Sequence, residues 1–225
     1  LTDEGFLVDW RVAETMRQGV SAHLEEFSPE DISVMQPMNR AGQRLIDSLS
    51  ATMPITVTPS DQFLCSREEF AEWASANTRK DGSLLMEDFY RWQRRRLDIL
   101  IDSDGEPVGG RWNYDDENRL SPPKGEHQWP AVIRRELDDV DAWVTDFLAS
   151  IDGLVMKGEP PTGLWATDRE GAMRQLQHFL RHAIDEFGPY EDAIVGAEPY
   201  LNHSLLSPYL NIGLLHPAEV IAAVK

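Results

Sequence analysis

The pattern of apolar and polar positions in the first sixty residues alternates between short apolar runs and longer amphipathic stretches. Apolar side chains that recur every three or four residues indicate a helix, and short β-branched runs indicate strands. Strands separated by helices favour a parallel sheet with right-handed crossovers. We therefore predict an α/β, doubly wound parallel sheet, with strands at 6–12, 32–35 and 55–57 and helices at 16–27 and 41–49.

Two further helices are predicted after this sheet. Ser66 and Glu69 have the spacing of a capping box, which begins a helix that runs to residue 76. A second helix, over 84–101, carries an arginine cluster. Such a cluster is typical of a solvated or ion-paired helix face in an acidic protein, but it also suits a stripe that faces phosphates. The sequence leaves both interpretations open for Arg91, Arg94, Arg95 and Arg96.

The pattern changes at 102–129, which is rich in Gly, Pro, Asp and Asn. Regular structure is not expected there, and a loop of this length in a compact domain is usually functional or a linker. We place a domain boundary within it. Beyond it, helical spacing predicts helices at 133–150 and 167–187; Thr167 and Glu170 form a second capping box, and Gly188 ends the helix.

Charge and cysteine content narrow the class of protein. The chain has 225 residues and a formal net charge of −18, so non-specific binding to nucleic acid by its whole surface is not expected. Cys65 is the single cysteine, which excludes an internal disulfide and any iron-sulfur site built by this chain alone. We expect a reducing, cytoplasmic location, and no apolar run is long enough for a membrane anchor. Because the chain starts at Leu1 without a signal peptide, we expect a fragment or a processed product.

Few motifs point to catalysis. His178 and His182 have a spacing that can hold a metal, but we interpret them as surface or interhelix histidines. Cys65 lies beside Arg67 before a helix, and a structural cysteine is favoured over a nucleophile. No GxSxG motif and no glycine-rich phosphate loop is present. The sequence predicts no metal site and identifies no catalytic residue.

The C-terminal segment at 198–220 mixes hydroxyl and amide side chains with leucines, between prolines. This composition suits a half-buried polar ligand. Ser204 and Ser207 lie near expected helix starts, where a hydroxyl and free backbone N–H groups can hold a phosphate. Alternatively, these serines are N-caps that satisfy their own helices.

The run HSLLSPYLNIGLLHP at 203–217 resembles the flavin-binding signature of the photolyase and cryptochrome superfamily. Within that superfamily, four other segments resemble the deoxyribodipyrimidine photolyase-related branch, which comprises the bacterial iron-sulfur cryptochromes and (6-4) photolyases. These segments are FLCSREEFAEWA at 63–74, MEDFYRWQRRR at 86–96, GGRWNYDDENR at 109–119 and FGPYED at 187–192.

The resemblance implies a partial chain with three regions. Residues 1–101 correspond to an antenna-type α/β domain that is incomplete at its N-terminus, so the doubly wound sheet is partial. Residues 102–129 form the interdomain connection. Residues 130–225 form the start of an all-helical FAD-binding domain that is incomplete at its C-terminus.

The resemblance also implies a cofactor and its site. Members bind FAD as a light-driven electron donor, and residues at the matching positions would hold it without transferring protons. His203 stands where many members have Thr. The expected FAD-binding residues are Tyr190, His203, Ser204, Leu205, Leu206 and Ser207.

The function implied is repair of a (6-4) pyrimidine lesion in damaged DNA by electron transfer from reduced FAD. The alternatives are a cryptochrome-type blue-light photoreceptor without repair activity and a truncated, non-catalytic remnant. Full-length relatives also carry an antenna lumazine and a four-iron four-sulfur cluster, whose cysteine ligands are absent from this sequence. Contacts with DNA are expected mainly from a C-terminal region that the sequence lacks.

Overall fold

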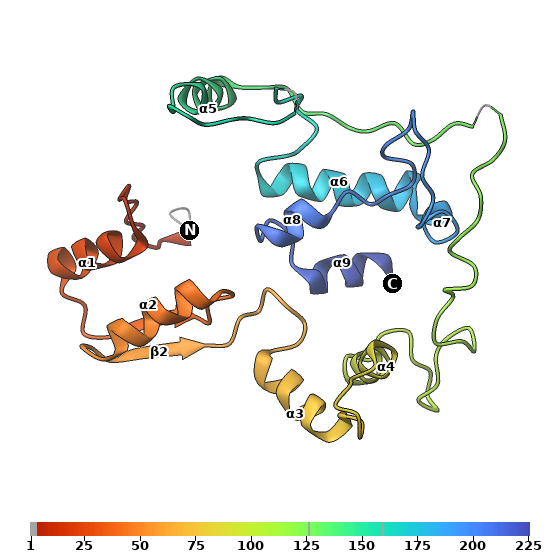
Figure 1. The fold of residues 1–225 in the computed structure, drawn as a ribbon, viewed down its shortest axis with the longest axis horizontal. Helices are drawn as coiled ribbons and strands as arrows, with labels where there is room; N and C mark the ends of the chain where they lie inside the picture. Colours follow the sequence, from red (N-terminus) through yellow and green to blue (C-terminus); the bar gives the residue numbers. More distant parts are fainter. Residues whose placement is uncertain (1–3, 126, 159) are drawn as a thin grey trace. The chain divides into compact units, whose positions relative to one another are not determined.

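The computed structural model describes residues 4–125, 127–158 and 160–225. The chain divides into two compact units, which meet in the sequence between Asp61 and Gln62 (Figure 1). We describe each unit by itself.

The first unit is an αβαβ arrangement with a two-stranded parallel sheet. Ile32 pairs with Ile55 and Met35 with Thr58, so the register holds over the whole length of both strands. Thr15 and Asn39 cap the two helices through their side chains. The elements are α1 (Met16–Phe27), β1 (Ile32–Met35), α2 (Arg40–Ser50) and β2 (Ile55–Thr58).

The strand predicted at 6–12 is wrong. The described residues there form no ladder, and Leu7, Trp10 and Val12 are among the most exposed apolar side chains of the chain. Side-chain contacts with α1 hold the segment instead: Arg11 pairs with Glu26 at 2.6 Å, and Asp9 lies 2.6 Å from His23. The parallel α/β class is confirmed for 32–58, whereas a doubly wound sheet stays a prediction.

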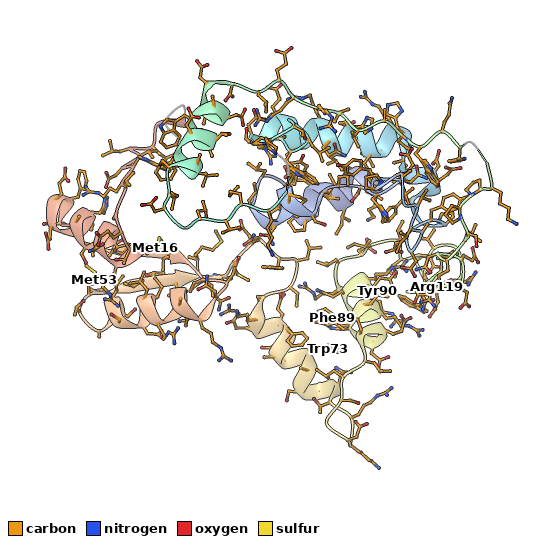
Figure 2. All side chains as sticks on the ribbon, turned by 45° about the horizontal axis from the view of Figure 1, so that its top comes forward. Met16, Met53, Trp73, Phe89, Tyr90 and Arg119 are labelled. Atoms are coloured by element: carbon orange, nitrogen blue, oxygen red, sulfur yellow. The ribbon has the colours of Figure 1, made fainter. Side chains whose placement is uncertain are left out.

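The second unit begins with two helices, α3 (Arg67–Asn77) and α4 (Met86–Arg96). The capping box of α3 is confirmed: Glu69 N donates to Ser66 Oγ at 3.1 Å, and Ser66 N donates to Glu69 Oε2 at 2.8 Å. Trp73 of α3 and Phe89 of α4 lie edge to face with ring centroids 4.9 Å apart (Figure 2). Their aromatic rings therefore join the two helices.

Helix α4 is shorter than the predicted span of 84–101. It ends before Asp98 and Leu100, whose positive φ values of 51° and 50° are incompatible with a continuing right-handed helix. Apolar spacing continues past the end of the helix because Leu97 and Ile99 are half-buried in the loop. Apolar periodicity alone therefore placed the boundary too late.

The remaining helices belong to the second half of this unit, as predicted. Helix α5 starts six residues later than expected, because Asp138 caps it by accepting from Val140 N at 2.9 Å and Asp141 N at 3.1 Å. The capping box predicted at Thr167 is also wrong: Asp168 Oδ1 accepts from Gly171 N at 2.6 Å and caps α6. Ala183, with non-helical φ and ψ, then divides the span predicted as 167–187. The helices are α5 (Asp139–Ala149), α6 (Arg169–His182), α7 (Ile184–Phe187), α8 (Ser207–Asn211) and α9 (Pro217–Val224).

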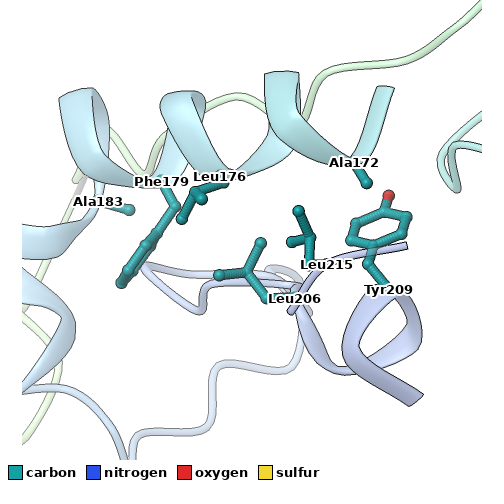
Figure 3. Close-up of a cluster of buried hydrophobic side chains, with 7 residues drawn as sticks. All are labelled: Ala172, Leu176, Phe179, Ala183, Leu206, Tyr209 and Leu215. Atoms are coloured by element: carbon teal, nitrogen blue, oxygen red, sulfur yellow. The ribbon is translucent and has the colours of Figure 1, made fainter. Parts of the chain in front are cut away.

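One buried apolar cluster lies where α6 meets the C-terminal segment (Figure 3). Leu176 of α6 has 0% of its surface exposed, and Tyr209 of α8 has 2%. Burial of such side chains contributes about 1.5–3 kcal/mol each. The cluster consists of Ala172, Leu176, Phe179, Ala183, Leu206, Tyr209 and Leu215.

The segment at 102–129 has no regular helix or strand in its described residues, as predicted. It is nevertheless tied to later parts of the same compact unit. Leu120 N donates to Pro189 O at 3.1 Å, and Asp192 N donates to Asn118 O at 3.3 Å. The compact units thus divide at 61/62 and not within this segment. The assignment of 1–101, 102–129 and 130–225 to antenna-type, connecting and FAD-binding regions stays a prediction.

The arginine cluster of α4 is engaged inside the chain. Arg94 is buried and donates to three backbone carbonyls, those of Ile99, Leu100 and Trp112. Arg91 pairs with Glu87 at 2.8 Å, Arg96 pairs with Glu69 at 2.5 Å, and the Arg95 guanidinium lies 4.3 Å from the centroid of the Trp112 ring. These contacts favour the ion-paired interpretation over a phosphate-facing stripe.

None of the helices in the described residues combines the length and the apolar character needed to cross a membrane.

Candidate functional site

Two leucines of the segment between α7 and α8 have a left-handed backbone conformation. Leu201 and Leu205 have positive φ values of 42° and 57°, which are unusual for residues with a branched side chain. His203 N donates to Tyr200 O at 2.9 Å and closes a turn that contains Leu201. The backbone is therefore strained at Leu201 and Leu205, and such strain is common at sites that hold a ligand.

The flavin-like signature run has a buried side and an accessible side. Leu206 packs into the apolar core, whereas His203, Ser204 and Leu205 are half-buried and Ser207 is exposed. The buried amide of Gln175 on α6 donates to Ser204 O at 3.0 Å and holds the run against the core. The fold therefore presents the polar side chains of this run at the surface.

The two serines differ in how far they are engaged. Ser204 Oγ accepts a long bond of 3.4 Å from Leu206 N, which satisfies part of its own segment. Ser207 is the first residue of α8, and the N-cap of that helix is Leu206, which has no capping side chain. The N-cap interpretation therefore does not apply to Ser207, and its exposed hydroxyl is free of that role.

Tyr190 lies in a group of aromatic rings. Its ring centroid is 5.6 Å from that of Trp129 and 6.5 Å from that of His127. Its backbone N–H donates to Glu186 O at 3.3 Å, and Glu186 Oε2 accepts from Asn202 Nδ2 at 3.1 Å. Glu186 thus links Tyr190 to the turn that leads into the signature run.

His127 Nε2 has no hydrogen-bond partner among the described residues, although its atom is buried. The nearest carboxylate oxygen, Glu186 Oε2, is 3.5 Å away, which meets an ion-pair distance but not hydrogen-bond geometry. This ring nitrogen and Asn118 Oδ1 are the two buried side-chain atoms without a hydrogen-bond partner among the described residues.

The sequence did not identify Gln175, Glu186, His127 or Trp129 as part of this region. A signal existed for Gln175, because it is a polar residue on the otherwise apolar face of α6, beside Leu176 and Ala172. His127 and Trp129 lie in a segment without periodicity, so no pattern could place them near Tyr190.

A hollow of about 780 Å³ lies next to this region, between α4, the turn at 113–118 and the turn at 188–191. Four carboxylates line it, from Glu87, Asp115, Glu117 and Glu191. Arginines outside the lining neutralise two of them, since Arg91 pairs with Glu87 and Arg111 with Glu117. Among the described residues, the lining offers no cationic side chain that could bind the diphosphate of a dinucleotide.

The structure gives little support to a histidine metal site or to a cysteine nucleophile. The rings of His178 and His182 are 4.8 Å apart, and no group of three or more metal-ligating side chains is suitably placed among the described residues. Burial, with the nearby His182 charge second, lowers the pKa of His178. Burial raises the pKa of the Cys65 thiol, which opposes the thiolate that a nucleophile needs.

Comparison with known proteins now identifies the family. The family model for deoxyribodipyrimidine photo-lyase-related proteins matches residues 1–170, which is more than half of the chain. The chain belongs to this family.

Two relatives of this photolyase-related chain define how far the similarity extends. A (6-4) photolyase of Agrobacterium fabrum (strain C58 / ATCC 33970) is 34% identical over 215 residues, which cover 92% of this chain and 40% of that protein. The uncharacterized protein R852 of Acanthamoeba polyphaga mimivirus is 23% identical over 129 residues, which cover 55% of this chain and 64% of that protein. The chain thus spans about two fifths of the length of the (6-4) photolyase.

Proposed function

We propose that this photolyase-related chain contributes to light-driven repair of (6-4) pyrimidine lesions in DNA. The observation that carries the proposal is its 34% identity to a protein named (6-4) photolyase, over 92% of the chain. Because the similarity covers 40% of that relative, the activity and the DNA partner of the relative are proposals for this chain.

The residues at 190–207 suit an FAD cofactor in their chemistry and exposure. Bound FAD would supply a reduced flavin that donates an electron when it absorbs light. The exposed hydroxyl of Ser207 and the half-buried His203 and Ser204 can donate hydrogen bonds to phosphate oxygens. The ring of Tyr190 and the side chain of Leu205 offer half-buried apolar surface.

Two further cofactors of full-length relatives are not proposed to bind this chain alone. A four-iron four-sulfur cluster needs four cysteine ligands, and Cys65 is the single cysteine. No residue of this chain is proposed to bind an antenna lumazine. Location in the cytoplasm stays a prediction.

The first test is flavin retention by the 225-residue chain. Retention of a structured flavin band between about 300 and 500 nm, after reconstitution with FAD and removal of free flavin, would support a site at 190–207. Ser207→Ala should weaken retention at least about tenfold, because one phosphate donor is lost, at about 1.5–3 kcal/mol for a bond to a charged group. Ser75→Ala, an exposed serine on α3, is the matched control. A flat spectrum with the folded wild type would contradict the proposed site.

Repair is tested separately by illuminating the flavin-loaded protein with DNA that contains a (6-4) lesion. Loss of the lesion under blue light, and not in the dark, supports the enzyme. Flavin photoreduction without repair would contradict repair by this chain and leave the cryptochrome-type photoreceptor and the non-catalytic remnant as the alternatives.

A further inference from the structure

Helix α5 carries an apolar stripe along one face. Val140, Trp143, Val144 and Phe147 follow the spacing that places side chains on one side of a helix. Trp143 and Val140 each keep 65% of their surface exposed, and Phe147 keeps 52%. A contiguous apolar stripe that is left open to water is costly and usually marks a contact surface.

No described part of the second compact unit, 62–225, buries this stripe. No residue of α5 is buried, in contrast to α6, which buries five. The Trp143 and Phe147 rings stack on each other with centroids 5.6 Å apart and an interplanar angle of 10°. The two stacked rings thus lie together on helix α5, which Figure 1 labels.

The charged residues beside the stripe are acidic, and a cation neutralises them on one border only. In heptad terms, Val140 and Phe147 occupy a positions and Trp143 occupies a d position. Asp139 and Asp146 then both occupy g positions, on one border of the stripe. On the opposite border, Asp141 is bound by Arg135, with Nη1 at 2.6 Å from Oδ2. The helix itself contains no cation. The uncompensated charge is therefore confined to the Asp139 and Asp146 border.

We infer that the α5 stripe docks an amphipathic helix of a protein partner whose apolar side is bordered by lysine or arginine. The apolar side would cover Trp143 and Phe147, and the basic border would pair with Asp139 and Asp146. Heptad-flanking charges of this kind determine which helices associate.

Charge separates this partner from two other occupants of the stripe. A second copy of α5 would bring its own acidic border and no cation to the interface, so self-pairing lacks compensation. An anionic bilayer would repel the same border. The inference is independent of FAD binding, because α5 contains none of the residues proposed to hold the cofactor.

The test uses the 225-residue chain and two synthetic amphipathic helical peptides of about three heptads. The peptides share one leucine stripe and differ only in their borders, which carry Lys in one and Glu in the other. We expect the Lys peptide to bind at least about fivefold more tightly by fluorescence anisotropy, because two exposed ion pairs replace two repulsions. Raising the salt concentration should reduce the difference.

Three variants locate the contact. Asp139→Asn with Asp146→Asn should remove most of the preference for the Lys peptide. Trp143→Ser with Phe147→Ser should weaken the binding of both peptides at least about tenfold, because the apolar contact is lost. Val155→Ser with Met156→Ser removes exposed apolar surface outside α5 and should leave binding unchanged. Circular dichroism of each variant verifies that the helices remain folded.

Any of three results would overturn the inference. Equal affinity for the two peptides would remove the role of the acidic border. Concentration-dependent dimerisation that Phe147→Ser abolishes would assign the stripe to a second copy. Absence of binding to either peptide up to about 1 mM, with the wild type folded, would leave the stripe without a helical partner.

Discussion

Gly163 shows how a single backbone position constrains this fold. Its φ is +72°, and a Cβ atom there would lie 2.1 Å from Arg135 O. Arg135 N also donates a backbone hydrogen bond to Gly163 O at 2.9 Å. The segments around 135 and 163 therefore cannot move apart without losing this hydrogen bond. Both the dihedral angle and the space at 163 therefore require glycine.

We predict that Gly163→Ala lowers the free energy of unfolding by about 3 kcal/mol or more, from backbone strain plus the clash. Gly153→Ala is the matched control, because φ is +77° there but nothing lies within 4 Å of the added Cβ. It should cost only about 1 kcal/mol. Urea unfolding measures both, and equal losses would show that the clash relaxes.

Arg94 is the second decisive residue, because its guanidinium holds the end of α4 and the following loop together. It keeps only 8% of its surface exposed and donates to Ile99 O at 3.1 Å and Leu100 O at 2.6 Å. We expect Arg94→Met to cost about 3 kcal/mol, since it leaves three partly buried backbone carbonyls without this donor. Arg95→Met, at an exposed neighbour, should cost about 1 kcal/mol or less. Urea unfolding of the two variants compares them directly.

At the scale of elements, α5 and α9 of the second unit each begin with a capping box whose third helical residue is acidic. Asp141 at the start of α5 accepts bonds from Arg135, and Glu219 at the start of α9 accepts bonds from Arg169. Hydrogen bonds from these arginines, followed by backbone hydrogen bonds, lower the pKa of Asp141 and that of Glu219 to about 2. Both carboxylates are therefore held in their charged form by the fold.

The pH dependence of stability follows from these lowered values. A carboxylate with a lowered folded pKa stabilises the protein above its unfolded pKa, near 4, and loses that contribution as the pH falls towards 2. We predict that Asp141→Asn and Glu219→Gln each flatten the decline in unfolding free energy between about pH 4 and pH 2. Asp146→Asn on α5 serves as the control in urea unfolding at both pH values. A decline as steep as that of the wild type would contradict the assignment.

At the scale of the whole molecule, the core is unevenly distributed between the two compact units. Among the described residues of 4–61, only Leu49 is buried, whereas the cluster around Leu176 and Tyr209 lies in 62–225. We predict that hydrogen exchange protects the amides of α6 most strongly and those of β1 and β2 much less, because local stability follows buried apolar contact. Similar protection in the two units would contradict this.

Leu176→Ala should abolish the protection of α6, at a cost of about 2–5 kcal/mol.

The sequence by itself determined the elements with strong local signals. The helix at 16–27, the short strands near 32–35 and 55–57 and the Ser66 capping box depend on neighbouring residues, and each is confirmed. The family was also accessible from sequence, because its motifs are contiguous runs that need no folding to be recognised. Residues 6–12 show the limit of this information. Their β-rich composition predicted a strand, but a strand exists only when a partner supplies its hydrogen bonds.

Tertiary structure decided what depends on contacts between distant residues. It assigned the arginines of α4 to partners inside the chain, and it brought Gln175 to Ser204 across 29 positions and Asn202 to Glu186. It also determined that Ser207 is exposed at the start of α8 while Leu206 beside it is buried. Periodicity records which face of a segment is apolar, but not which other segment covers it. For the same reason, only the folded chain shows that the apolar stripe of α5 is left open.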